Sequence, residues 1–162
     1  MIGLNKLNAS YSYAITSCLV LLLWGCGQDQ TPTEFTTPAA TFKTYRDALA
    51  AQNFEKAWTC FSRSYQGQVH EGDFSRWLKT IQQGPEKSDA VLQREISAEK
   101  IINDRIGYLL FDSTTLPSSQ VSPFFYFIRE EQNWKITCHL DSTFHQELEN
   151  AIDQGQFKLP LD

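Results

Sequence analysis

The chain has 162 residues, of which 14 are basic and 19 are acidic, giving a net charge of −5, and 13% of the residues are aromatic. This length fits one folded domain, and the aromatic content is sufficient for a hydrophobic core. Domains that bind nucleic acid cluster Lys and Arg against phosphates, so an acidic chain without a basic run argues against that partner.

The N-terminus has the three parts of an export signal. A short polar start carries Lys6, an apolar run extends from Ala14 to Trp24, and the small residues Gly25 and Cys26 follow. This order is typical of a signal peptide. The apolar run has about half of the ~20 residues that a transmembrane helix needs, so no permanent membrane span is expected here.

The end of this signal resembles the bacterial lipobox, because Leu23, Trp24 and Gly25 stand directly before Cys26. The resemblance implies a signal peptide over residues 1–25 and a palmitate-type lipid anchor on Cys26. Several acyl chains hold a protein at a membrane more firmly than one. The resemblance also implies a bacterial cell-envelope location, and Gly27 favours the outer membrane facing the periplasm in a diderm cell. The alternatives are a secretory signal cleaved elsewhere and an uncleaved anchor.

Two further cysteines, Cys60 and Cys138, remain once the signal and the lipid site are set aside. Disulfides persist in exported domains, so one alternative is a bond between these two residues. The other alternative is two separate thiols that act as small apolar side chains. Sequence separation does not choose between the alternatives, because a disulfide requires close Cα atoms.

A tether and a first helix are predicted to follow the lipid site. Residues 26–37 are mostly polar and contain Pro, so they are predicted to form a flexible tether before a domain over residues 38–162. Apolar residues at helical spacing then predict a helix that begins at Pro38, with Thr37 as its N-cap. Asn53, which tolerates a left-handed backbone, is expected to end it.

Three more helices are predicted from the same spacing. They cover residues 54–61, residues 74–81 and, near the C-terminus, residues 144–155. Gly67 and Gly72 predict a loop between the first two of these helices.

Strands are predicted where the apolar period changes to two, over residues 91–102, 106–113, 124–129 and 134–140. A tight turn joins the last two strands, with Asn133 expected at positive φ. In the last strand, Trp134, Ile136, Cys138 and Leu140 are expected on the buried face, with Lys135, Thr137 and His139 on the wetter face.

Helices followed by an antiparallel meander indicate an α+β fold. Residues 42–58 resemble the opening helix pair, and residues 127–136 the final hairpin, of the nuclear transport factor 2-like fold, also called cystatin-like or SnoaL-like. The resemblance covers residues 38–141. It implies N-terminal helices packed on a curved antiparallel sheet, forming a cone with a pocket, as in small bacterial lipoproteins of unknown function. These motifs reflect packing and turns, so they specify fold better than function.

Two side chains are candidates for the acid or base that enzymatic relatives place in this pocket. Asp112 ends an apolar strand, and His139 lies on the last predicted strand. The favoured alternative for both is a solvated surface residue. His70 and His145 have no neighbours with the spacing of metal ligands, so neither a metal nor a cofactor is expected.

Aromatic side chains are the candidates for a ligand-binding pocket, with core packing as the favoured alternative for most of them. The candidates are Tyr45, Trp58, Tyr65, Trp77, Tyr108, Phe111, Tyr126 and Trp134.

The leading hypothesis is a non-catalytic, membrane-anchored envelope lipoprotein that binds a small apolar ligand or an envelope protein. One alternative is an envelope enzyme of the SnoaL or dehydratase type, and another is a structural spacer. Residues 124–127 are apolar on both faces of their strand. Either the last helix covers the outer face, or that face is a partner surface, such as a homodimer contact through the sheet.

Overall fold

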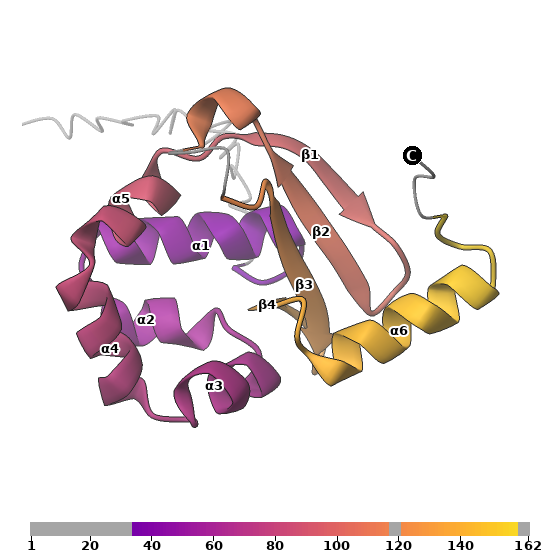
Figure 1. Ribbon diagram of the computed structural model, residues 1–162, viewed down its shortest axis with the longest axis horizontal. Helices are drawn as coiled ribbons and strands as arrows, with labels where there is room; N and C mark the ends of the chain where they lie inside the picture. The colour runs from indigo at the N-terminus through magenta and orange to yellow at the C-terminus, as the bar shows by residue number, and fades with distance from the viewer. Residues whose placement is uncertain (1–33, 117–120, 159–162) are drawn as a thin grey trace, which may run out of the picture.

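The computed structural model of the protein describes residues 34–116 and 121–158. Within these residues, five α-helices precede a four-stranded sheet and one follows it, so the predicted α+β fold is confirmed (Figure 1). The helices before the sheet are α1 (Pro38–Ala50), α2 (Phe54–Thr59), α3 (Arg63–His70), α4 (Phe74–Gln83) and α5 (Pro85–Leu92). The strands are β1 (Ile96–Ile101), β2 (Ile106–Phe111), β3 (Phe124–Glu130) and β4 (Asn133–Thr137). A short 3₁₀ helix, η1 (Ser113–Thr115), follows β2, and α6 (Ser142–Asp153) follows the sheet.

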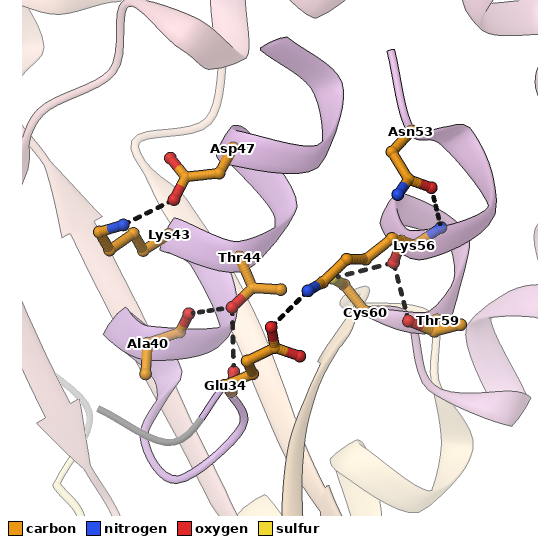
Figure 2. A network of polar contacts seen from close by, with 9 residues as sticks. All are labelled: Glu34, Ala40, Lys43, Thr44, Asp47, Asn53, Lys56, Thr59 and Cys60. Atoms are coloured by element: carbon orange, nitrogen blue, oxygen red, sulfur yellow. Dashed lines mark hydrogen bonds and ion pairs between the residues drawn. The ribbon is translucent and has the colours of Figure 1, made fainter. Parts of the chain in front are cut away.

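The first helix begins where the sequence predicts. The Thr37 hydroxyl accepts a hydrogen bond from the Ala40 amide at 3.1 Å, and Pro38 occupies the first helical position. The end of α1 differs from the prediction, because Gln52 rather than Asn53 takes the positive φ of 54°. Asn53 instead caps α2, accepting from the Lys56 amide at 3.1 Å (Figure 2).

The predicted loop around Gly67 is wrong, because this segment forms α3. The Ser62 hydroxyl accepts from the Tyr65 amide at 3.0 Å and caps the helix, which outweighs the helix-breaking tendency of one glycine. The helix ends at Glu71, whose φ of 55° is left-handed.

The strand predicted over residues 91–102 begins later, at Ile96. Its first two residues, Val91 and Leu92, belong to α5, which starts at Pro85 directly after α4. Proline suits the first turn of a helix, so the Gly84–Pro85 pair ends one helix and starts another.

The sheet is an antiparallel meander with the order β1-β2-β3-β4. At the β3–β4 turn, Glu131 and Gln132 take φ values of 48° and 72°, the pattern of a two-residue hairpin turn. The expectation of positive φ at Asn133 is therefore wrong, since this residue begins β4. The strand ends at Thr137, so the segment with Cys138, His139 and Leu140 leaves the sheet, and Leu140 is exposed rather than buried. Thr137, expected on the wetter face, is buried, because its hydroxyl donates to the buried Asp141.

Alternate residues of β3 belong to two separate hydrophobic clusters. Phe127 is fully buried in a cluster with α1, α2 and α4, and Phe125 packs against that cluster. Ile128 lies in the second cluster, with Phe144 and Ala151 of α6. Figure 1 shows α6 on the other side of the sheet from α1, α2 and α4. The last helix therefore covers part of the outer face, the first alternative from the sequence.

Backbone hydrogen bonds attach the α2–α3 connection to the free edge of β4. The Ile136 amide donates to the Cys60 carbonyl, and the Ser62 amide donates to the Ile136 carbonyl, both at 2.8 Å. Next to this join, the carboxylate of the fully buried Asp141 accepts from the Thr137 hydroxyl at 2.5 Å and caps α6. These hydrogen bonds therefore join the α2–α3 connection, β4 and the start of α6 at one corner of the sheet.

The start of the described chain is held against the first two helices. The Thr44 hydroxyl of α1 donates to the Glu34 carbonyl, and the Glu34 carboxylate pairs with Lys56 of α2 (Figure 2). Within residues 34–116 and 121–158, no helix is both long and apolar enough to cross a bilayer.

Candidate functional site

A cavity of about 430 Å³ lies where α3 and α4 face the ends of β3 and β4. This volume falls in the range of small-molecule binding sites. Its lining consists of aromatic, aliphatic and small polar side chains, and no described lining residue is a carboxylate. The lining residues are Tyr45, Phe61, Tyr65, His70, Trp77, Thr80, Ile81, Ser122, Phe124, Phe125, Tyr126, Ile136, Thr137, Cys138 and His139.

Aromatic rings in mutual contact form much of the cavity wall. Phe61 is at the centre: its ring stacks on Tyr65 at 4.7 Å between centroids and meets Tyr45 at 5.1 Å and Trp77 at 5.7 Å. Edge-to-face and offset contacts of this kind add rigidity beyond simple burial. The wall is therefore preformed by packing from α1, α3 and α4.

His70, at the end of α3, is a polar side chain in this wall. It is 8% exposed and its ring lies 5.9 Å from Trp58 and 6.0 Å from Tyr65. Its imidazole forms no hydrogen bond with any residue that the structure describes, although it borders the cavity. Burial, followed by the charge of Arg76, lowers the pKa of His70, which keeps the ring neutral at pH 7.

Two tyrosines contribute hydroxyl groups close to the cavity. Burial is the main cause that raises the pKa of Tyr45 and of Tyr65, so both phenols stay protonated at neutral pH. The Tyr65 phenol also raises the pKa of Tyr45, whereas the charge of Arg94 lowers it. Neither hydroxyl has a hydrogen-bond partner within the described chain. Both are therefore free to bind a polar group of a ligand.

Behind the cavity wall lies a buried arginine without an acidic partner. Arg94 is 7% exposed, and its guanidinium carbon lies 5.0 Å from the ring centroid of Phe125 and 5.4 Å from that of Phe111. Its Nε atom is buried without a hydrogen bond, and no carboxylate of the described residues forms an ion pair with the side chain. Loss of hydration lowers the pKa of Arg94. A buried cation of this kind is costly unless something compensates its charge.

The structure separates the aromatic pocket candidates into three groups. Tyr45, Tyr65, Trp77 and Tyr126 line the cavity. Trp58, Phe111 and Trp134 do not line it: Phe111 and Trp134 belong to the hydrophobic core, and Trp58 packs against that core. Tyr108 lines a second cavity of about 240 Å³ beside α6, which shares Phe124 and Tyr126 with the first.

The two acid or base candidates are not brought together. Asp112 is exposed and caps η1, accepting from the backbone and the hydroxyl of Thr114, both at 2.8 Å. These hydrogen bonds lower the pKa of Asp112, so the carboxylate stays ionised. His139 is also exposed, at the mouth of the cavity. Among the described residues, no three His, Cys, Asp or Glu side chains cluster as metal ligands would.

The two cysteines are free thiols, the second of the alternatives left by the sequence. Cys60 is fully buried, and its thiol donates to the Lys56 carbonyl at 3.5 Å (Figure 2). Burial raises the pKa of Cys60 to about 12. Cys138 is half-buried and lines the cavity, so its thiol is a natural reporter of cavity occupancy.

Sequence reasoning missed His70 as a cavity residue, because its position depends on α3, which was not predicted. The signal available was Ser62, whose hydroxyl caps α3, the helix that ends at His70. Lipidation at Cys26 falls outside the described residues. No known protein family, curated protein or solved structure is significantly similar to this chain.

Proposed function

We propose that this protein is a lipid-anchored lipoprotein of the bacterial cell envelope whose domain binds a small, largely apolar ligand. The observation that carries the binding role is the cavity of about 430 Å³, with its ring-lined wall and a few polar groups without protein partners. This combination of apolar wall and sparse polar groups is typical of ligand-binding sites. The anchor rests on the signal and lipobox pattern that ends at Cys26.

The fold supports this proposal through the position of the cavity. Helices α1 to α4 lie against one face of a four-stranded meander, and the cavity lies between them and the sheet. This is the arrangement expected of a nuclear transport factor 2-like cone. In our proposal the cone holds the ligand, and the polar segment after Cys26 keeps the domain clear of the lipid surface.

A catalytic role is less well supported by the residues around the cavity. Proton-transfer chemistry uses paired groups whose pKa values are driven apart by their surroundings. The described lining contains no carboxylate. Asp112 has a lowered pKa and caps η1 at the surface. The polar lining groups are better suited to hydrogen bonding with a ligand than to general acid or base catalysis.

Two measurements test the two parts of this proposal. The intact mass of protein extracted from bacterial membranes is expected to correspond to a chain that begins at Cys26 and carries acyl groups. An unacylated chain, or one that keeps residues 1–25, contradicts the anchor.

The cavity is tested by alkylation of Cys138 with iodoacetamide, followed by mass analysis of the modified peptides. Replacing Thr80, an exposed cavity residue of α4, with Trp is expected to slow alkylation by filling the opening. Lys79→Trp on the same helix is the control, because Lys79 is exposed but does not line the cavity. Equal rates in both variants contradict an open cavity at Cys138.

A further inference from the structure

The described lining of the cavity has no acidic side chain, although the chain as a whole is acidic. The protein has 19 acidic residues against 14 basic ones, yet none of the described lining residues is acidic. The two histidines of the lining, His70 and His139, carry no negative charge in any protonation state. Such a lining does not repel a negatively charged ligand.

His70 is the polar wall group best placed to bind a ligand directly. It is more than nine-tenths buried, it borders the cavity, and the described chain provides no hydrogen-bond partner for its ring. Only the Nε of Arg94 and the hydroxyl of Ser88 are fully buried without a partner among the described residues, so the His70 nitrogens remain reachable from the cavity and present an unpaired polar group to a ligand. A neutral imidazole has one N–H to donate, and a carboxylate oxygen is a strong acceptor for it.

Arg94 adds a second, independent indication of an anion. Its guanidinium lies behind Phe125 and close enough to Tyr45 to act on its phenol, and both of these side chains line the cavity. The arginine has no carboxylate partner in the described chain, so its field is not neutralised locally. In an apolar site such a field acts over a longer distance than in water.

From these observations we propose that the cavity selects an apolar or aromatic monocarboxylic acid, whose carboxylate accepts a hydrogen bond from His70 and is stabilised by the positive field of Arg94. This inference rests on the proposed function and names the class of ligand. The ring-lined wall holds the apolar part, and the hydroxyls of Tyr45 and Tyr65 are available to the second carboxylate oxygen.

The test uses three soluble probes with the same apolar part: 4-phenylbutanoate, 4-phenylbutan-1-ol and 4-phenylbutyl-trimethylammonium. Each is added to the full chain in bacterial membranes, and protection of Cys138 from iodoacetamide is followed by peptide mass analysis. The acid is expected to protect at a concentration at least about tenfold lower than the alcohol, as for hydrogen bonds to charged groups. The ammonium probe is expected to protect least.

Variants assign the preference to the two side chains. His70→Phe keeps an aromatic ring against Trp58 and Tyr65 but removes the N–H, and Arg94→Met removes the charge while keeping an apolar stem. Each is expected to reduce the ratio between acid and alcohol several-fold, whereas Arg94→Lys retains most of it. Arg63→Met, at a side chain 77% exposed on α3, is the control and is expected to leave the ratio unchanged.

The outcomes separate this inference from the proposed function. Equal protection by acid and alcohol overturns the inference and leaves the binding role intact. Stronger protection by the ammonium probe also overturns it and indicates an aromatic cage for cations. A ratio that survives both His70→Phe and Arg94→Met overturns the assignment of the carboxylate site. No protection by any probe contradicts the binding role itself.

Discussion

Replacing Asp141 with Ala is expected to lower the free energy of unfolding by about 2–4 kcal/mol. Asp141 is fully buried, and its Oδ1 accepts from the amides of Thr143 and Phe144 at 2.9 and 3.2 Å, which caps α6. Its Oδ2 accepts from the Thr137 hydroxyl at 2.5 Å. Loss of the cap costs about 1 kcal/mol. The Thr137 hydroxyl left without its acceptor adds about 1–3 kcal/mol.

The assay is equilibrium unfolding in urea, followed by tryptophan fluorescence, on a chain that begins after Cys26. Asp141→Asn is the matched control, because Asn is an equally good N-cap and its amide can donate to the Thr137 oxygen. It is expected to cost less than half as much as Asp141→Ala.

A double-mutant cycle with Thr137→Val isolates the hydroxyl–carboxylate contact. The two side chains interact directly, so their effects are expected to be non-additive by about 0.5–3 kcal/mol. The Ser62 hydroxyl, 3.3 Å from the Thr137 hydroxyl, belongs to the same network. A cost for Asp141→Ala of less than about 0.5 kcal/mol, as for a surface substitution, would refute the structural role assigned to this network.

Three other predictions concern the backbone, the thiols and the pH dependence of stability. Gly107→Ala places a Cβ 2.7 Å from a β1 carbonyl oxygen and is expected to destabilise by about 1–3 kcal/mol in urea. Gly67→Ala, in open space on α3, is expected to stabilise by about 0.4–1 kcal/mol instead; equal effects contradict the packing at β1. Iodoacetamide at pH 8 is expected to modify Cys138 but not the native Cys60, whose pKa of about 12 keeps it protonated; peptide masses decide this. The lowered pKa of His70 means that the unfolded chain binds a proton more readily than the folded one, so stability is full above about pH 6.5 and falls as pH decreases through the folded pKa. His70→Phe is expected to flatten this part of a pH series of urea unfolding curves, and an unchanged slope contradicts the burial of the ring.

The sequence predicted those elements whose boundaries depend on local chemistry. The N-cap at Thr37 and the proline after it define the start of α1, and Asp73 defines the start of α4. Both caps act within one helical turn, so they can be read directly from the chain. The antiparallel order of the last two strands followed in the same way from a short polar turn.

The elements that sequence reasoning missed depend on packing at a distance. Gly67 favours a loop by intrinsic propensity, but Tyr65 of α3 stacks on Phe61 and holds the helix against the core. Val91 and Leu92 fit an alternating pattern, yet they end α5. Short apolar runs are ambiguous between helix and strand, and only the neighbouring elements settle them.

The candidate site was predicted in part for the same reason. Three of the aromatic candidates from the sequence, Tyr45, Trp77 and Tyr126, lie in the lining of the cavity. Their pattern along the chain does not separate them from Trp134, which is buried in the core, because cavity and core residues follow the same apolar spacing. The role of Arg94 could not be predicted from the sequence either, because its separation from carboxylates arises only in the folded chain.

The measurement that tests the central claim most directly is identification of small molecules that co-purify with the full chain expressed in a bacterium. Wild-type protein and Lys79→Trp are expected to release the same apolar carboxylic acid on denaturation. Thr80→Trp, which fills the cavity opening, is expected to release little or none. Recovery of the same compound from all three proteins, or of none from the wild type, would contradict a ligand-binding role for the cavity.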